Sequence, residues 1–268
     1  MSQESSSPAG SAAVQGDLWS ARAQDWADVQ ELVQRPLYTS ILQEVMQGSH
    51  VDLLDVGCGS GLFTAMAAAA SRASGLDAAG ALLAIAKRRT PQADFRVGEM
   101  EALPFDSRTF DVVTGINSFQ FAANPLNALC EARRVGAPKA RLIIATWGRM
   151  EECDTAAYFD ALSPPDTSSP PGAPGPFALS ADGALAELAS QAGLEPQDVH
   201  DVDCPFAFPD EAMALRGLLS PGPAVLAMQQ SSEAQVREAV RAAIQPFRTG
   251  TGGIHLKNRF RYLVAKVP

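Results

Sequence analysis

The sequence predicts an α/β fold in which an open, mostly parallel sheet carries helices on both faces. Two observations support this prediction: short apolar runs alternate with helical segments between residues 51 and 147, and the first apolar run ends in glycines. Such alternation is typical of parallel strands joined by crossover helices. The chain has 268 residues, of which 46% are hydrophobic, so it can build one large core without disulfide or metal cross-links.

Strands and helices can be placed in order along this region. Short apolar runs that end in glycine or polar residues predict buried strands, and alanine-rich or amphipathic segments predict helices. The expected strands are 51–56, 74–77, 94–97, 109–116 and 140–147, and the expected helices are 62–73, 79–89 and 125–135. Pro91 ends the second helix, whereas Pro125 starts the third, where a missing N–H costs nothing.

The flanking segments differ in character. Residues 1–16 are rich in small and polar residues and are expected to be disordered. Residues 17–50 should form an N-terminal helical cap, which Pro36 divides into two helices. Beyond Trp147 we expect a proline-rich loop at 163–176, a helix at 179–194 with Ser180 as its N-cap, a strand at 200–208, short helices within 209–247, and a last strand at 258–267.

These elements suggest a core made of 51–208 and 257–268, with residues 209–256 inserted before the last strand. The insert carries several large apolar residues. We interpret it as a lid over an apolar substrate; the alternative is that these residues form a small core of their own.

Composition argues against several classes of protein. Lys and Arg number 21 against 30 Asp and Glu, a net charge of −9, and such a chain repels nucleic-acid phosphates. The four cysteines and three histidines are scattered without metal-ligand spacing, so no metal site is expected. We see neither a secretory leader nor an uncharged apolar stretch of roughly 20 residues, and therefore expect a cytoplasmic protein without a membrane span.

The most specific local signal is LLDVGCGSG at 53–61, where an acidic residue at a strand end precedes a glycine-rich turn. Glycines let a ligand approach the backbone, and the following helix can offer free N–H groups to anionic oxygens. Leu62 stands where a dinucleotide fingerprint would have its third glycine. Asp77 ends the second strand, 20 residues after Gly57, where a carboxylate can accept hydrogen bonds from a ribose.

Together these motifs resemble those of the class I S-adenosylmethionine-dependent methyltransferases, most closely the branch with the ubiquinone and menaquinone biosynthesis enzymes. LLDVGCGSG resembles the family's first motif and GLDAAGALLAIAKRR (75–89) its second; residues 97–121 and 131–147 resemble the segments that follow. The resemblance implies a Rossmann-like, doubly wound, seven-stranded sheet with an antiparallel last strand. It also implies S-adenosyl-L-methionine as cofactor and methyl transfer to O, N or C of a small, hydrophobic molecule.

The resemblance assigns roles to individual residues. Glu99 stands where the family usually has Asp, and where many relatives have a histidine after the fourth strand this chain has Gln120 and Phe121. The implied cofactor-binding residues are Asp55, Gly57, Cys58 and Gly59 at the methionine, Asp77 and Ala78 at the ribose and adenine, Glu99 and Met100 beside the adenine, and Asn117 and Ser118 near the methyl group.

Further candidates come from aromatic residues and one histidine. Trp19 and Trp26 lie seven residues apart on one helix face and either cover the cofactor or anchor the helix in the core. Gln120, Phe121 and Trp147 are expected at the substrate. A general base is needed only if the accepting atom must lose a proton. His255, in the glycine-flanked loop 250–258, is the candidate for it, with a solvated or structural histidine as the alternative.

Two other functions remain open from the sequence. One is a nicotinamide-dependent oxidoreductase on the same sheet, against which Leu62 and the segment 97–105 argue. The other is a protein that keeps the cofactor pocket but acts as a regulatory module or catalyses a different reaction. The missing histidine after the fourth strand leaves that second alternative open.

Overall fold

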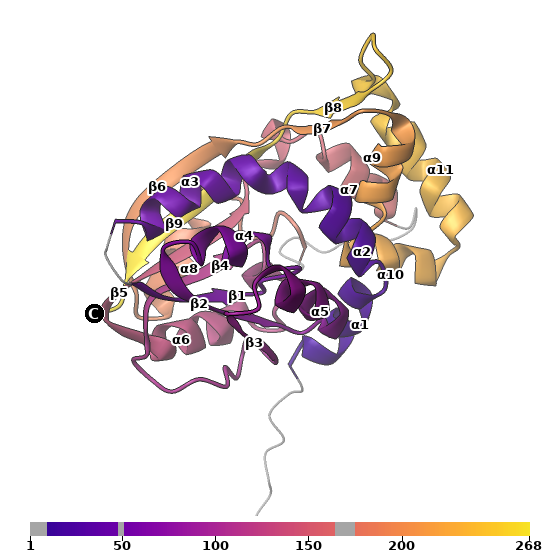
Figure 1. The fold of residues 1–268 in the computed structure, drawn as a ribbon. Coiled ribbons are helices and arrows are strands. Elements are labelled where there is room, and N and C mark those ends of the chain that lie inside the picture. Colours follow the sequence, from indigo (N-terminus) through magenta and orange to yellow (C-terminus); the bar gives the residue numbers. More distant parts are fainter. Residues whose placement is uncertain (1–9, 48–50, 164–174) are drawn as a thin grey trace, which may run out of the picture.

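A seven-stranded sheet between two helical layers forms the centre of the protein (Figure 1). The computed structural model describes residues 10–47, 51–163 and 175–268. The strand order is β3-β2-β1-β4-β5-β9-β6, in which β9 runs antiparallel to both of its neighbours. The strands are β1 (Val51–Val56), β2 (Ser71–Asp77), β3 (Asp94–Val97), β4 (Phe110–Ile116), β5 (Gly136–Trp147), β6 (Glu195–Asp203) and β9 (Arg259–Lys266). The expected mostly parallel sheet with an antiparallel last strand is confirmed.

Helices cover both faces of this sheet because successive strand residues point to opposite sides and both sides are apolar. On β1, for example, Leu53 packs with one helical layer and Leu54 with the other. The first layer holds α3 (Arg35–Val45), α4 (Leu62–Ala67) and α5 (Gly80–Arg89), and the second holds α6 (Pro125–Val135) and α8 (Ala184–Gln191).

A helical cap lies at one end of the sheet, where helices distant in sequence meet (Figure 1). Arg216 pairs with Asp25 and Asp28, and Arg22 pairs with Glu233. These ion pairs join the N-terminal helices to the segment inserted before β9. The cap contains α1 (Ala12–Ser20), α2 (Ala23–Asp25), the π-helical turn η1 (Trp26–Gln30), the turn η2 (Leu32–Gln34), α7 (Ala156–Leu162), α9 (Glu211–Leu218), α10 (Gly222–Gln230) and α11 (Glu233–Ile244).

The inserted helices do not form a separate core. Leu215 of α9 and Val240 of α11 belong to the same buried cluster as Leu53 and Val112 of the central strands. A small two-stranded sheet, β7 (Phe206–Phe208) with β8 (Ile254–Leu256), connects the insert to the rest of the chain. The remaining elements are the turns η3 (Phe119–Phe121), η4 (Met150–Glu152) and η5 (Gln245–Phe247).

The N-terminal segment differs from the prediction of a disordered stretch at 1–16. Residues 1–9 lie outside the described part, but α1 begins at Ala12. Tertiary contacts order it, because the Ala12 amide donates a hydrogen bond of 2.7 Å to Glu99 and Gly16 packs on Ala78. Pro36 lies in the first turn of α3, directly after η2 ends at Gln34, so a helix boundary falls at this proline as expected, although the segment before it is divided further into α1, α2, η1 and η2.

Three further expectations are corrected. The helix expected at 62–73 ends at Ala67, because the chain must reverse to pair Ser71 with Val51, and this pairing overrides alanine's helix propensity. The strand expected at 200–208 is two strands in different sheets, interrupted at Pro205, which has no N–H for a ladder. Helix α8 starts at Ala184 rather than at residue 181, since Ser180 bonds back to Phe177 instead of capping. Most of the proline-rich loop, 164–174, lies outside the described residues.

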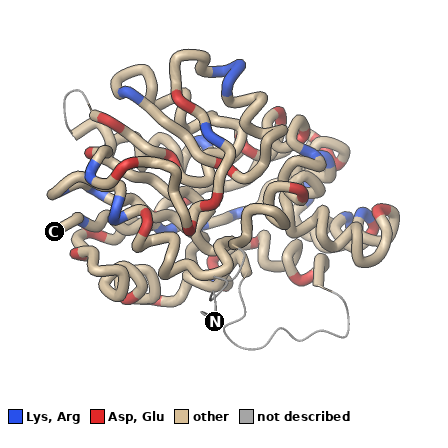
Figure 2. Tube along the Cα trace, turned by 90° about the horizontal axis from the view of Figure 1, so that it is seen from below, with Lys and Arg blue, Asp and Glu red and all other residues tan. Residues whose placement is uncertain are grey.

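Charged residues of both signs are interspersed along the chain (Figure 2). Many arginines are paired: Arg261, for instance, contacts Asp182 and Asp201. Within the described residues, no helix is long and apolar enough to cross a membrane.

We predict that the central strands carry much of the stability. Leu54→Ala should lower the free energy of unfolding by about 2–5 kcal/mol, because Leu54 is fully buried on β1. Chemical denaturation measures this loss. The control is Val97→Ala on the edge strand β3, where the side chain is 61% exposed and the loss should be within about 0.5 kcal/mol. Equal losses in the two variants would contradict this assignment of the core.

Candidate functional site

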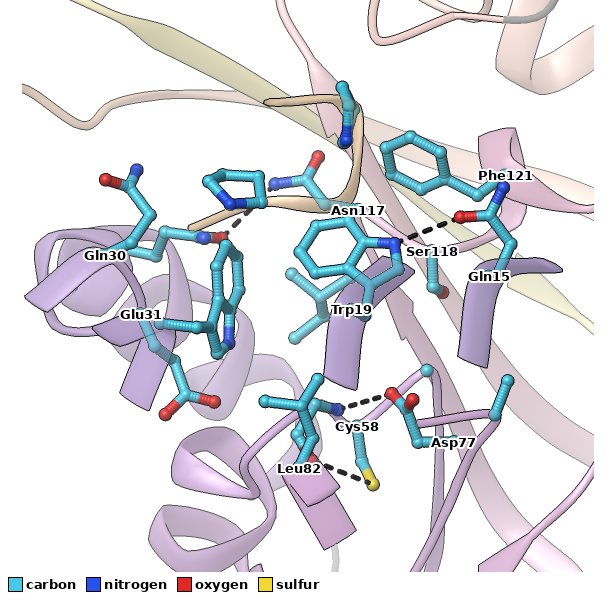
Figure 3. A pocket seen from close by; sticks show the side chains of 18 of the residues that line it. Gln15, Trp19, Gln30, Glu31, Cys58, Asp77, Leu82, Asn117, Ser118 and Phe121 are labelled. Atoms are coloured by element: carbon cyan, nitrogen blue, oxygen red, sulfur yellow. Dashed lines mark hydrogen bonds between the residues drawn. The ribbon is translucent and has the colours of Figure 1, made fainter. Parts of the chain in front are cut away.

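A pocket opens beyond the carboxyl ends of β1, β2, β3 and β4, where parallel sheets of this kind bind ligands. The helical cap closes its other side through residues of α1, η1, α7 and α10, and α3 contributes Tyr38. Figure 3 shows its floor and one wall. Most of the predicted site residues line this pocket: Trp19, Trp26, Gly57, Cys58, Gly59, Asp77, Ala78, Glu99, Met100, Asn117, Ser118, Phe121 and Trp147.

The glycine-rich turn after β1 forms the floor of the pocket. Gly57, Gly59 and Gly61 all have positive φ, which disfavours other residues. At Gly57 space is also lacking, because a Cβ there would lie 2.3 Å from the Cβ of Ser118. This turn therefore brings the ends of β1 and β4 into direct contact.

Four of the five amides of the turn, residues 57–61, are not free for an anion, contrary to the expectation from sequence. The amides of Gly57 and Cys58 donate to the Leu76 carbonyl at 2.7 and 3.0 Å, and the Gly61 amide donates to Cys58. The Gly59 amide donates to Asp77 at 2.8 Å. These amides are used to hold the turn on β2.

Asp77 links the turn to the next strand (Figure 3). One carboxylate oxygen accepts from the Gly59 amide and the other from the Ala79 amide, each at 2.8 Å. Burial raises the pKa of Asp77, and these hydrogen bonds oppose the rise. Each oxygen has a second lone pair that can accept from a ligand hydroxyl.

Glu31 is a site residue that sequence reasoning missed. It is 1% exposed and lines the pocket beside the turn. Its carboxylate accepts from the Ser60 hydroxyl at 2.5 Å, from the Leu62 amide at 3.4 Å, and from Arg89 in an ion pair. A protein carboxylate thus occupies the position beside the first turn of α4 where an anion would otherwise sit.

Neighbouring polar residues share the face of Glu31. Gln30, Gln34 and Tyr38 also line the pocket, at spacings of four residues. A polar stripe at this spacing within an otherwise apolar segment is the signal that could have identified them.

Asp55 does not line the pocket but lies beneath it. Its two oxygens accept from the hydroxyls of Thr64 at 2.8 Å and Thr114 at 2.9 Å. Burial raises the pKa of Asp55 to about 6, despite these hydrogen bonds. Asp55 therefore holds β1, α4 and β4 together below the turn, and contacts a ligand only indirectly.

The helix α1 covers the side of the pocket near Glu99. One Glu99 oxygen accepts from the Ala12 amide at 2.7 Å and the other from the Glu101 amide at 3.1 Å. Trp19 points into the pocket from α1 (Figure 3), edge-on to Trp26 and to Phe121 with ring centroids 4.9 and 5.6 Å away. Both tryptophans thus cover the pocket and pack with the alanines and leucines of the neighbouring helices.

Amide side chains form a neutral polar group at the end of β4. Asn117 has a φ of 53°, a left-handed conformation that asparagine tolerates better than most residues. Its amide nitrogen donates to Gln34 at 3.3 Å, and its oxygen accepts from Gln120 at 3.5 Å. Gln120 itself is buried behind Asn117 and does not line the pocket, so its expected contact with substrate is indirect.

His255 does not reach the pocket. It is the middle residue of the three-residue strand β8. Its neighbours Ile254 and Leu256 are buried, whereas His255 is on the opposite side of the strand and is exposed. The strand pairing with β7 fixes this orientation. Among the residues described, no cluster of three His, Cys, Asp or Glu side chains could hold a metal ion.

Charge divides the pocket into two ends. The ionisable acids among its lining residues are Glu31, Asp77 and Glu99, and no Lys, Arg or His occurs in that described lining. Trp147, Phe159 and Phe206 form the opposite, aromatic end. The acidic end suits a cation with hydroxyl groups, and the aromatic end suits an apolar molecule.

Residues 54–144 match the family model described as a methyltransferase domain. The chain carries a class I S-adenosylmethionine-dependent methyltransferase domain. The matched residues run from β1 through β5 and contain the glycine turn, Asp77, Glu99 and Asn117. S-adenosyl-L-methionine is the cofactor of this domain, and the acidic end of the pocket fits it, because the molecule carries a sulfonium and an ammonium against one carboxylate.

Several curated proteins resemble the methyltransferase domain. A demethylmenaquinone methyltransferase of Renibacterium salmoninarum is 36% identical over 35% of this chain and 40% of its own length. A ubiquinone biosynthesis O-methyltransferase of Cereibacter sphaeroides is 34% identical over 36% of this chain and 41% of its own. The match thus spans less than half of either relative.

Solved structures share the fold at low sequence identity. The YcgJ protein from Bacillus subtilis superposes with a TM-score of 0.59 at 15% identity, covering 85% of this chain and 97% of the other. A [4+2]-cyclase, SpnF, superposes with a TM-score of 0.57 at 18% identity, covering 87% of this chain and 80% of the other.

The buried Asp55 yields a prediction about pH. Its pKa of about 6 in the folded protein exceeds its usual value of 3.8, so the unfolded chain loses the proton first. Its contribution to stability is therefore complete below pH 4 and lost as the pH rises through 6. Between pH 4 and pH 7 the wild type should lose about 2 kcal/mol relative to Asp55→Asn.

Urea denaturation of both proteins at the two pH values measures this difference. Asp198→Asn, at an exposed position, serves as the control and should track the wild type. A constant difference between wild type and Asp55→Asn would show that Asp55 titrates normally.

Proposed function

We propose that the protein transfers the methyl group of S-adenosylmethionine to a small, hydrophobic molecule. The observation that carries the proposal is the separation of charge in one pocket: carboxylates surround the glycine turn, and aromatic side chains face it from the cap. A cationic cofactor and an apolar acceptor would thus each meet a complementary surface.

The residues at the acidic end have distinct roles in this proposal. Asp77 accepts hydrogen bonds from the ribose hydroxyls through its free lone pairs. Glu31, whose charge is shared with Arg89, lies beside the turn and accepts from the ammonium group of the methionine portion, since four of the turn's amides are already used. Glu99 and Met100 lie beside the adenine, and Trp19 and Trp26 shield the cofactor from water.

The same features argue against a nicotinamide cofactor. A dinucleotide brings a pyrophosphate with two negative charges to the turn between the first strand and helix. Here Glu31 lies at the first turn of α4, and the amides of Gly57, Cys58, Gly59 and Gly61 donate within the chain. Few backbone donors are therefore left for a pyrophosphate.

The chain's contribution to the reaction is alignment and exclusion of water. The bound cofactor supplies a methyl group on a sulfonium, which a nucleophile displaces in line. Holding both reactants in one dry pocket contributes several of the roughly 7–11 kcal/mol available from proximity. Because His255 faces outward and does not line the pocket, it is not placed to take a proton from the acceptor, and we assign it no role as general base.

The main alternative is a protein of the same fold that does not methylate. We retain this alternative because the structurally similar protein SpnF is a [4+2]-cyclase, and its similarity covers 87% of this chain. Incubation with methyl-labelled S-adenosylmethionine and a panel of phenols, amines and quinones separates the two. Label in any acceptor supports the methyltransferase, whereas tight cofactor binding without transfer to any panel member favours the alternative.

Cofactor affinity provides a direct prediction. Asp77→Ala should weaken binding of S-adenosylhomocysteine by about 1.5–3 kcal/mol, because hydrogen bonds to a charged group are lost. Isothermal titration calorimetry measures the change. Asp94→Ala, on the exposed edge strand β3, is the control and should bind normally. Unchanged affinity in Asp77→Ala would remove this carboxylate from the site.

A further inference from the structure

The aromatic end of the pocket is a chamber built from parts of the chain that are distant in sequence. We define it by Trp147 at the end of β5, Tyr158 and Phe159 on α7, Phe206 on β7 and Leu218 on α9. The rings of Phe159 and Phe206 lie edge-on to Trp147, with centroids 5.5 and 5.9 Å away. None of these five side chains is charged, so the chamber favours apolar and aromatic surface.

One polar atom in this chamber is unsatisfied. Tyr158 is 3% exposed, and its buried hydroxyl has no hydrogen-bond partner in the described part of the chain. Burial raises the pKa of Tyr158, so the hydroxyl keeps its proton and can donate. A buried hydroxyl without a partner costs about 1–3 kcal/mol, and folded proteins seldom leave one unexplained.

The neighbouring hydroxyl groups show the contrast. Thr155, one turn before Tyr158 in the same wall, donates to the Asn258 side chain at 2.8 Å. Tyr262 on β9, outside the pocket, shares a hydrogen bond of 3.3 Å with Ser40. Trp26 and Gln30, which also line the pocket, have unpartnered polar atoms as well. Three of the six unpartnered buried side-chain atoms in the described residues thus line this pocket; the other three, on Thr90, Thr146 and Glu152, do not.

We propose that the Tyr158 hydroxyl selects the methyl acceptor, and that this acceptor is an uncharged, flat aromatic molecule with an oxygen that hydrogen-bonds to Tyr158. This inference rests on the proposed methyltransferase function and specifies its substrate class. The rings of Trp147, Phe159 and Phe206 bury the face of the acceptor, and Tyr158 fixes its oxygen.

Charged acceptors are disfavoured by the same surroundings. A carboxylate entering the chamber would find no cation among the pocket's described lining residues, and Glu31 lies in the same pocket. An ammonium has no lone pair with which to accept a hydrogen bond from the Tyr158 hydroxyl. A neutral molecule with a single hydrogen-bonding oxygen meets both conditions.

Calorimetric binding with matched probes tests the inference without requiring turnover. The protein is saturated with S-adenosylhomocysteine and titrated with thymol, with cymene, which is thymol without its hydroxyl, and with the anion cuminate. Thymol should bind the wild type about three- to ten-fold more tightly than cymene, and cuminate should bind most weakly. Tyr158→Phe should abolish the preference for thymol and leave affinity for cymene and S-adenosylhomocysteine unchanged.

Tyr262→Phe is the matched control, because it removes a tyrosine hydroxyl outside the pocket; it should keep the preference for thymol. Equal binding of thymol and cymene to the wild type, a preference for cuminate, or a preference retained in Tyr158→Phe would each overturn the inference while leaving the proposed function in place. Failure of S-adenosylhomocysteine itself to bind would overturn both. If Tyr158→Phe does not fold, equal binding of thymol and cymene by the wild type still overturns the inference.

Discussion

The hydrogen bond from the Gly59 amide to the Asp77 carboxylate is the interaction on which the site depends. It joins the ends of β1 and β2 at 2.8 Å and holds the glycine turn in its left-handed conformation. Because the turn is fixed there, Gly57 can touch Ser118 of the neighbouring strand, and Glu31 can reach Ser60 and the first turn of α4. The floor of the pocket, the end of β4 and the N-terminal cap are all positioned by this one corner.

Electrostatics then determines which ligand this corner can accept. Four of its five amides donate within the chain, and the carboxylates of Glu31, Asp77 and Glu99 line the pocket around it. A corner of the same backbone shape with free amides would suit phosphates, whereas this one suits a cation with hydroxyl groups. The shared fold therefore decides where a ligand binds, and the side chains packed on the turn decide its charge.

Sequence reasoning could predict what is local and not what is assembled from distant segments. The glycine turn follows β1 and Asp77 ends β2, the next strand in the sequence, so both could be recognised locally. The structure places both at the pocket. Glu31, between η1 and η2, and Tyr158, on α7, escaped notice because no local pattern specifies how the helical cap docks on the sheet. His255 was misplaced for a related reason: pairing with β7, which turns it outward, depends on a strand nearly fifty residues away in the chain. The helix after the glycine turn was likewise predicted too long. Its alanines favour a helix, but helix propensity carries no information about where β2 must begin to pair with β1.

A crystal structure of the protein with bound S-adenosylhomocysteine tests the central claim most directly. The account predicts the ribose on the carboxylate at the end of β2, the amino-acid portion over the glycine turn beside Glu31, and the sulfur facing the aromatic end of the pocket. A nucleoside bound elsewhere, or a turn whose amides have left β2 to hold the ligand's carboxylate, would contradict it.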